Sequence, residues 1–497
     1  MKYLSLRNII LISLFFRILA VIFSKGFAFS DDHFEIIEIA QSWLDGVPFT
    51  AKGEIYLFSL LYVGLHTIIL GACESLGIYN PEVKMFIIRL FHALFSLFTV
   101  YYGYKLTEVL CRKSNNEIKI FNFNLPQLVG LILGIFWLFP FMSVRSLREF
   151  FCIPFLIAGF YFLLSDKNNT SFKNLVISTF LFAIAFDVRY QTIFFPLGVG
   201  LVLLFNKQTF KNAVIFGFLF IFFVSITQLL FDYLYWGSPI ASIKAYTAYN
   251  ATHSADYPQG DWFMYILTIG GLLLAPACFL LFIGFFYNWK KYLIIFVPTA
   301  LFFLFHSYFP NKQERFILPM LPFIIILGVI GFADYYSKNN QKQWVKLGSK
   351  GLIIYFLVLN TIGLFALTFT YTKRSRVESM TYLYKKGDVK NIVFEGEGEI
   401  PFPPTFYLGK RINYFEIKAD KDVKILKKEI ETRINEKPNY LIITGSNNLK
   451  QREERMKTIF PNIKEEKAIA PGFVDNIAFY LNPSHNVNET WYIYKIN

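Results

Sequence analysis

The sequence carries little charge and few residues of the kinds that hold metals or form disulfides. Asp, Glu, Lys and Arg make up 17% of its 497 residues, whereas about a quarter is usual in soluble proteins. Its four cysteines include no CxxC pair, and its six histidines show no metal-ligand spacing. The sequence also contains no internal repeat, no low-complexity tract and no Gly-rich phosphate loop. These absences argue against an ordinary soluble domain, a structural zinc site and a disulfide framework.

Apolar residues dominate instead. They make up 55% of the chain, with 59 Phe, and apolar runs recur from Asn8 to Gly351 and beyond. Many of these runs reach the roughly 20 residues that cross a bilayer as a helix. The formal net charge is +14, and the cations gather between the apolar runs, as they do in cytoplasmic loops of membrane proteins. No basic face or recognition motif for nucleic acid accompanies them. The composition therefore predicts a polytopic, all-α membrane protein that does not bind nucleic acid.

The positions of the basic connectors predict the topology. Placing Lys2, Arg7 and the Lys/Arg-rich connectors in the cytoplasm gives about eleven spans. The predicted spans are residues 8–29, 84–104, 124–143, 150–165, 172–188, 191–206, 212–235, 263–287, 292–308, 316–335 and 351–371. The first run is too long for a removed signal peptide, so we interpret it as a span. The apolar segment 55–78 does not fit the alternation, and we interpret it as a re-entrant or membrane-embedded piece, with a twelfth span as the alternative.

The last part of the chain differs in character. Residues 1–372 form the predicted transmembrane domain, with a first external loop at 30–83, and residues 373–497 form a predicted soluble α/β domain, periplasmic or lumenal. Strands are predicted at 391–396, 439–445, 475–481 and 490–496, and amphipathic helices at 422–435 and 447–460. A structural cap over the membrane part is as good an interpretation of this domain as a catalytic one.

The predicted topology places five polar segments on the external side of the membrane. They are the loop with Asp31 and Asp32 and residues 143–149, 187–191, 236–262 and 309–316. Together they bring five cations, Arg145, Arg148, Arg189, Lys312 and Arg315, to the side that carries the carboxylates. Basic side chains at helix ends often only anchor the helix in the membrane interface. Five of them opposite an acidic loop favour a site that transfers a group from an anionic lipid-phosphate donor, because Arg stabilises a departing phosphate and a carboxylate can accept a hydroxyl proton.

The same segments carry a family resemblance. PNKQERFILPMLP at 310–322 is similar to the HKEERFLFP-type motif of the dolichyl-phosphate-mannose-dependent mannosyltransferases of GPI-anchor and N-glycan synthesis, which belong to the GT-C superfamily. SDDHFE at 30–35 resembles the HPDE-x-F-Q signature of their first lumenal loop. VRSL at 144–147, VRYQTIFFP at 188–196 and the run from FDYLYWGSP to WFMY at 231–265 resemble further family segments in the same order. The resemblance covers roughly residues 1–335.

The sequence also departs from the family pattern. Phe29-Ser30 replace His-Pro, Asp32 replaces Glu, Asn311 replaces His and Gln313 replaces the first Glu. The Asn-Ser-x-Glu portion and the Cys-His segment of eukaryotic members have no clear counterpart. These departures indicate a divergent polyprenyl- or dolichyl-phosphate-sugar-dependent enzyme, with a bacterial cytoplasmic membrane favoured over the endoplasmic reticulum and an extracytoplasmic active site.

Residue roles follow from the resemblance. It implies that Asp31 is the catalytic base and that Asp32 orients the acceptor or holds Asp31. The implied contacts to the donor phosphate and sugar are Arg145, Arg189, Lys312 and Arg315, with Glu314 ordering Arg315. The implied contacts to acceptor or lipid are Asn250, Tyr257, Trp262 and Tyr265. The implied reaction moves a hexose, most simply mannose, from a polyprenyl phosphate to a hydroxyl of a glycan or glycolipid, with inversion and without a cofactor.

Three alternatives remain open from the sequence. Other GT-C activities, such as protein O-mannosylation or the modification of lipid A or of a cell-surface polysaccharide, differ in the acceptor rather than in the chemistry. A transporter would carry ionisable residues in mid-span or internal repeats. The run from Asp31 to Glu35 also reads as a D-D-x-x-E prenyl-transfer motif, which would hold a divalent cation near Asp31 and Asp32, although no second Asp-rich motif is present.

Overall fold

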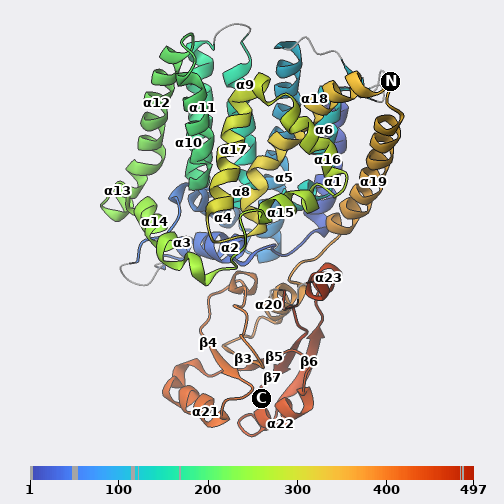
Figure 1. Cartoon of the computed structure of the whole chain (residues 1–497). Coiled ribbons are helices and arrows are strands. Elements are labelled where there is room, and N and C mark those ends of the chain that lie inside the picture. Colours follow the sequence, from blue (N-terminus) through green and yellow to red (C-terminus); the bar gives the residue numbers. More distant parts are fainter. Residues whose placement is uncertain are drawn as a thin grey trace. The chain divides into compact units, whose positions relative to one another are not determined.

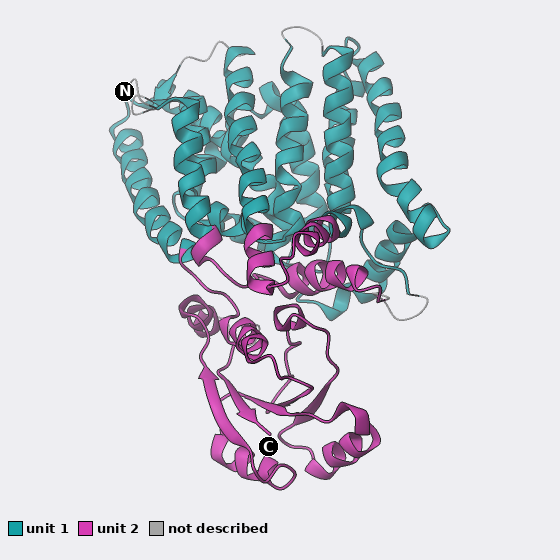
Figure 2. Ribbon diagram, turned by 180° about the vertical axis from the view of Figure 1, so that it is seen from behind, with its two compact units in different colours: residues 1–20, 48–65, 89–368 teal, residues 21–47, 66–88, 369–497 magenta. Residues whose placement is uncertain are grey.

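A computed structural model describes residues 4–47, 54–113, 118–120, 123–166, 170–481, 483 and 486–496. Lys2, residues 48–53 of the predicted external loop, residues 114–117 and 167–169 of the predicted connectors 105–119 and 167–173, and His485 lie outside these ranges. The chain divides into two compact units (Figure 2). The bundle unit comprises residues 1–20, 48–65 and 89–368, and the sheet unit comprises residues 21–47, 66–88 and 369–497. Each unit is described by itself.

The bundle unit is helical, and its helices run side by side (Figure 2). The helices up to the middle of the chain are α1 (Leu6–Phe23), α4 (Leu60–Ser75), α5 (Pro81–Lys113), α6 (Leu125–Ile135), α7 (Leu138–Met142), α8 (Arg148–Phe151), α9 (Ile153–Leu164), α10 (Phe172–Val188), η2 (Tyr190–Ile193) and α11 (Phe194–Leu204). They are followed by α12 (Phe210–Val224), the π-helix η3 (Ser225–Leu229), α13 (Leu230–Trp236), α14 (Ala241–His253), η4 (Ser254–Asp256), α15 (Met264–Leu272), α16 (Cys278–Tyr287), η5 (Trp289–Tyr292), α17 (Leu293–Tyr308), η6 (Glu314–Met320), α18 (Leu321–Asn339) and α19 (Gln343–Thr368). A short hairpin, β1 (Lys119–Ile120) with β2 (Phe123–Asn124), precedes α6. The boundary between the units falls within α1, α4 and α5.

Six helical segments among the described residues are long and apolar enough to cross a membrane, compared with about eleven predicted. Two of the predicted spans are interrupted. The span at 124–143 breaks between α6 and α7, and the span at 263–287 breaks between α15 and α16, where Leu274 has a positive φ of 62°. Segment 55–78 forms helix α4. A hydropathy window averages over such breaks, so it counts one span where the backbone forms two short helices.

The break between α6 and α7 is held by polar side chains from other helices. Asn360 of α19 accepts a hydrogen bond from the Trp137 amide at 2.8 Å and donates one to the Ile135 carbonyl at 3.0 Å. Arg17 of α1, fully buried, donates to the Gly134 carbonyl at 2.8 Å and to Ser96 at 2.7 Å. A helix end in an apolar medium must satisfy its free backbone groups. Arg17 and Asn360 do this, and so they fix the direction in which the chain enters α7.

The sheet unit contains a five-stranded mixed sheet with strand order β4-β3-β5-β7-β6. Its strands are β3 (Ile392–Gly396), β4 (Tyr414–Lys418), β5 (Tyr440–Thr444), β6 (Lys464–Ile469) and β7 (Trp491–Lys495). Pairs β4–β3 and β3–β5 are parallel, and β5–β7 and β7–β6 are antiparallel. Its helices are α2 (Ser30–His33), the π-helix η1 (Phe34–Glu38), α3 (Ile39–Leu44), α20 (Arg374–Lys386), η7 (Thr405–Leu408), α21 (Val423–Thr432), η8 (Ile434–Glu436), α22 (Leu449–Lys457) and α23 (Phe473–Leu481).

Five of the six strands and helices predicted after residue 372 are confirmed. Strands β3, β5 and β7 and helices α21 and α22 lie within the predicted segments. The prediction of a strand at 475–481 is wrong, because this segment belongs to helix α23. Its apolar residues Phe473, Ile477 and Tyr480 recur at helical spacing once the preceding two residues are included, a pattern that a short window starting at Asp475 hides.

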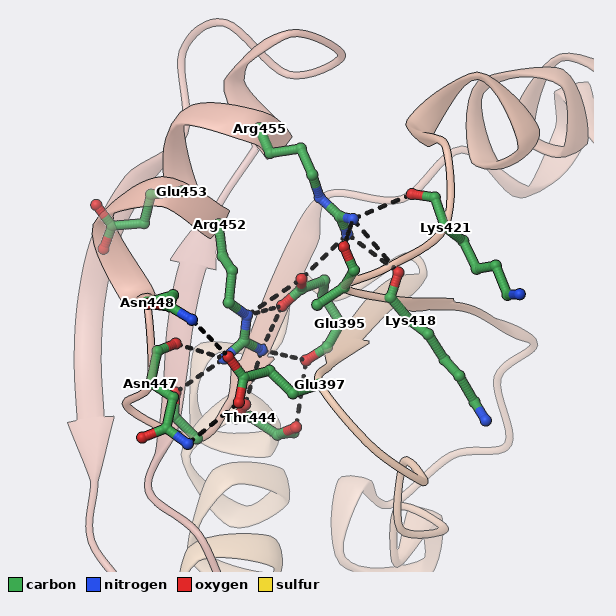
Figure 3. Close-up of polar contacts among 12 residues, drawn as sticks. Glu395, Glu397, Lys418, Lys421, Thr444, Asn447, Asn448, Arg452, Glu453 and Arg455 are labelled. Atoms are coloured by element: carbon green, nitrogen blue, oxygen red, sulfur yellow. Dashed lines mark hydrogen bonds and ion pairs between the residues drawn. The ribbon is translucent and has the colours of Figure 1, made fainter.

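A buried ion-pair network joins the ends of β3 and β5 to α22 (Figure 3). Glu395 has no exposed surface and accepts from Arg452 Nε at 2.8 Å and from Arg455 Nη2 at 3.1 Å. Arg452 also donates to the carbonyl of Thr444, at 2.8 Å. A buried carboxylate is stable only when it is paired and hydrogen-bonded. The network therefore sets the register between the parallel strands and the helix that covers them.

Candidate functional site

The predicted site residues divide between the two units. The bundle unit holds Arg145, Arg189, Lys312, Glu314, Arg315, Asn250, Tyr257, Trp262 and Tyr265, and the sheet unit holds Asp31 and Asp32. That the two sets share one site stays a prediction.

Two of the arginines follow the break after α6. The chain turns between α7 and α8, and this turn buries both Arg145 and Arg148. The Arg145 guanidinium lies 4.4 Å from the centre of the Phe141 ring. Arg148 lies 3.7 Å from the centre of the Phe58 ring and donates to the Tyr56 hydroxyl at 2.5 Å. An aromatic face thus packs against each of the two guanidinium groups.

Glu149 joins two more arginines. Arg189, where the backbone leaves α10 in an extended conformation, forms an ion pair through Nη1 with Glu149 Oε1. Arg315 Nε lies 3.6 Å from the same oxygen and donates to Gln313 at 3.0 Å. We call Arg145, Arg148, Glu149, Arg189 and Arg315 the arginine cluster. All four arginines of the cluster are buried, and Glu149 is shared by two of them, Arg189 and Arg315.

Arg189 has hydrogen-bond donors that the described residues of the protein do not use. The residue is 7% exposed, and within the described part of the chain its Nε and Nη2 atoms have no hydrogen-bond partner. The Phe316 ring packs against the guanidinium, with its centre at 4.9 Å. A buried donor without an acceptor costs about 1–3 kcal/mol, and more when it is charged. Two such donors on one planar fork match the bidentate geometry in which Arg binds a phosphate.

Lys312 has a different role from that of the arginines. Its buried ammonium donates to three carbonyls at the end of α17, those of His306 at 2.7 Å, Ser307 at 2.6 Å and Phe309 at 2.5 Å. These bonds use all three protons of the group. Burial lowers the pKa of Lys312, while the C-terminal end of a helix favours a cation. The geometry assigns Lys312 to capping α17 and to fixing the loop that leads to Arg315.

The variant Lys312→Met is expected to destabilise the protein by about 1–3 kcal/mol, because three carbonyl groups lose a buried donor. Thermal unfolding of the purified chain, followed by intrinsic fluorescence, measures this as a lower midpoint. The matched control is Lys346→Met, on an exposed position of α19. An unchanged midpoint together with a large loss of activity would instead return Lys312 to a role in binding the donor.

The remaining predicted residues of the bundle unit differ in accessibility. Glu314 is exposed, and Trp262 is 67% exposed. Tyr265 is buried, and its hydroxyl donates to the Gln313 carbonyl at 3.2 Å. The structure thus uses Tyr265 to hold the loop before Arg315. Tyr257 and Asn250 are half-buried; the hydroxyl of Tyr257 lies 2.6 Å from that of Tyr249, and the Asn250 amide donates to the Tyr246 carbonyl at 2.8 Å.

In the sheet unit, the two aspartates occupy distinct positions in α2. Asp32 is buried, and its Oδ2 accepts from the Phe29 amide at 3.2 Å as part of a capping box. Asp31, one residue earlier, is half-buried. The capping contact gives Asp32 a part in forming the turn and leaves Asp31 as the more accessible carboxylate.

The π-helix that follows α2 is fixed by a second carboxylate. Glu38 accepts from the Phe406 amide at 2.7 Å and from the Thr405 hydroxyl at 2.9 Å, both in η7. It also lies 3.3 Å from His33 Nε2. Glu38 therefore joins the acidic segment to residues 369–497 of the sheet unit. A π-helix often marks a functional segment, and this one begins two residues after Asp32.

Two carboxylates were missed as site residues in the sequence. Glu149 was present in the polar segment 143–149, but its link to Arg189 and Arg315 joins positions 40 and 166 residues away. Glu38 lies in the same acidic stretch as Asp31 and Asp32, but its contacts with Thr405 and Phe406 join positions more than 360 residues apart. Among the residues that the structure describes, no group of three or more His, Cys, Asp or Glu side chains could hold a metal ion. The cofactor-free reaction stays a prediction.

Comparison with known proteins gives a family match over most of the chain. Residues 8–393 match the model of the Alg9-like mannosyltransferase family. A mannosyltransferase of Arabidopsis thaliana is 22% identical over 436 residues, which cover 78% of this chain and 73% of the plant protein. The range 8–393 that matches the family model includes both the arginine cluster and the segment with Asp31 and Asp32.

Solved structures share the fold. ArnT from Cupriavidus metallidurans, bound to undecaprenyl phosphate, superimposes with a TM-score of 0.60 at 12% identity, covering 92% of this chain and 95% of that one. The oligosaccharyltransferase of Archaeoglobus fulgidus gives a TM-score of 0.54 at 12% identity, over 88% of this chain and 67% of that one. Both are GT-C enzymes. At these identities the similarity shows the fold alone.

Proposed function

We propose that this chain, which belongs to the Alg9-like mannosyltransferase family of GT-C membrane glycosyltransferases, transfers mannose from a polyprenyl phosphate to a hydroxyl of a glycan or glycolipid. Its family makes it a glycosyltransferase, so the transporter and prenyl-transfer alternatives no longer apply. The proposal concerns the donor, the acceptor class and the residues that act on them.

The observation that carries the proposal is the arginine cluster. Arg189 and Arg315 share the Glu149 carboxylate, and Arg189 keeps two buried donors without a partner among the described residues. Such a set is suited to a phosphate that gains negative charge as its bond to the sugar breaks. ArnT, which has the same fold, is described as binding undecaprenyl phosphate, and this supports a polyprenyl phosphate as the donor here.

The reaction needs one base and a group of cations. The acceptor oxygen attacks the anomeric carbon, the bond from that carbon to the phosphate oxygen breaks, and polyprenyl phosphate leaves with the bonding electrons. The proton of the attacking hydroxyl passes to Asp31, the more accessible of the two aspartates. A phosphate is a good leaving group when cations stabilise it, so no general acid is required. A single displacement inverts the anomeric configuration.

The buried cluster also limits which donor is used. A polyprenyl-phosphate sugar carries a single phosphate, which the guanidinium fork of Arg189 can bind. A nucleotide sugar would need further contacts for its base and ribose. The proposed place of action is the extracytoplasmic side of a bacterial cytoplasmic membrane. The polyprenyl chain anchors the donor in that membrane.

The test is a transfer assay with the purified full chain in lipid nanodiscs. The acceptor is a lipid extract from a strain that lacks this gene, and the donors are polyprenyl-phosphate mannose and, separately, GDP-mannose. Mass spectrometry is expected to find one added hexose on an extract component with the polyprenyl donor only. Transfer from GDP-mannose, or transfer of a different sugar in preference to mannose, would contradict the proposal.

A further inference from the structure

Helix α23 presents its apolar residues outward. Phe473 is 75% exposed, Tyr480 85% and Leu481 75%, and Ile477 on the same face is exposed as well. These positions follow the i, i+4, i+7, i+8 spacing of one helix face. Within α23, all of whose residues are described, only Asp475 is buried. A helix that covers a soluble core has the opposite arrangement, with its apolar face inward.

The contacts of Asp475 determine which side of α23 points inward. Its carboxylate accepts from the amides of Lys373 at 3.1 Å and Arg374 at 3.4 Å, which begin α20, and from the Gly472 amide at 3.2 Å. The carboxylate thus caps the first turn of α20. Because this contact fixes which face of α23 turns toward the domain, the exposed position of Phe473, Ile477, Tyr480 and Leu481 is a built feature of the fold.

The position of α23 in residues 369–497 of the sheet unit, which we call the sheet domain, indicates what covers its exposed apolar face. Figure 1 shows α20 and α23 at one end of the sheet domain, with α21 and α22 at the opposite end. The Lys373 amide donates to Asp475 of α23. Lys373 is five residues beyond Thr368, the last residue of the membrane-spanning helix α19. Five residues reach at most about 18 Å when fully extended. The covalent chain therefore keeps this end of the domain close to the surface of the bilayer.

The chemistry of the exposed face suits that surface. Helices that lie in a membrane interface bury Phe, Leu and other apolar residues about 5–10 Å deep, and Tyr is enriched at the level of the lipid headgroups. A contiguous apolar face of this kind is unfavourable in water. Helix α22, at the far end of the domain, reads LKQREERMK and carries no comparable face.

We propose that α23 lies in the membrane interface with Phe473, Ile477, Tyr480 and Leu481 inserted among the lipids, and so holds the sheet domain against the membrane. The occupant of this face is bilayer lipid. The helix thereby attaches residues 369–497 to the membrane in addition to the peptide link from α19. Its function is independent of which sugar the enzyme transfers.

Lipid quenching tests the proposal on the full chain in nanodiscs. The variants Tyr480→Cys and Ile477→Cys are labelled with an environment-sensitive fluorophore, and Ile425→Cys on α21, also at an exposed position, is the matched control. The native cysteines Cys73, Cys111, Cys152 and Cys278 are buried, and labelling of the unmodified chain measures their background. Lipids that carry a nitroxide on the acyl chain serve as the quencher.

The labels at positions 480 and 477 are expected to emit at shorter wavelength and to be quenched several-fold more strongly than the label at 425. Equal quenching at all three positions would overturn the proposal. A blue shift at 480 without lipid quenching would overturn it as well, because it would mean that protein, such as a second copy of the chain, covers the face. Testing two labelled positions guards against a single substitution that disturbs the helix.

Discussion

Arg189→Gln is expected to lower the rate of mannosyl transfer by about 10²- to 10³-fold, the loss seen when one preorganised donor to a developing anion is removed. Arg189 Nη1 pairs with Glu149, while Nε and Nη2 have no hydrogen-bond partner among the described residues. The glutamine amide can still bond to Glu149, so the loss reports the missing charge and fork. Initial rates at saturating acceptor, measured over a range of donor concentrations, give the effect on both kcat and KM.

Two further variants separate the effect of the charge from that of the planar fork and provide a control. Arg189→Lys keeps the charge but not the planar fork, so we expect its rate to fall between those of the unmodified enzyme and Arg189→Gln. Arg112→Gln is the matched control, because Arg112 is exposed and donates to the Ser165 carbonyl at 3.0 Å. If Arg189→Gln and Arg112→Gln reduced transfer equally, the arginine cluster would not be the donor site.

Asp31→Asn is expected to lower transfer by about 10²- to 10⁴-fold, the usual contribution of a general base. The asparagine has nearly the same shape but cannot accept the proton of the acceptor hydroxyl. The measurement is product formation in the nanodisc assay, with thermal unfolding as a check that the fold is retained. Transfer at the unmodified rate would remove Asp31 from the mechanism.

The neighbouring aspartates provide controls for this variant. In Asp32→Asn the side-chain oxygen can still accept from the Phe29 amide, so we expect a much smaller loss of transfer than for Asp31→Asn. Asp45→Asn, at an exposed position near the end of the same acidic stretch, is expected to leave transfer unchanged. A loss that is larger in Asp32→Asn than in Asp31→Asn would exchange the two proposed roles.

Much of the architecture could be predicted because it depends on local composition. Apolar runs, basic connectors and the alternation of strands and helices after residue 372 are properties of neighbouring residues. The helix break before Trp137 could not be predicted in this way, since it is stabilised by Arg17 and Asn360, which lie far away in the sequence. The same applies to α23, whose orientation depends on contacts of Asp475 with residues about one hundred positions earlier.

The candidate site shows the same limit. Arg145, Arg189 and Arg315 could be singled out from the sequence by residue type and position. The three-dimensional contacts were needed to find Glu149, which joins two of them. They were also needed to distinguish Lys312, whose donors are bonded to carbonyls, from Arg189, two of whose donor atoms have no partner among the described residues. Local sequence identifies which residues are charged, whereas only the fold shows which of their donors are already used.

The contact between Asn360 and the α6–α7 break has a consequence for biosynthesis. Ribosomes make the chain from its N-terminus, so the Trp137 amide and the Ile135 carbonyl enter the membrane more than two hundred residues before the side chain that satisfies them. Unpaired backbone groups in lipid cost several kcal/mol. The segment that presents Arg145 and Arg148 therefore reaches its final conformation only after the last membrane helix has been inserted, and a chain truncated before α19 would expose the break to membrane quality control.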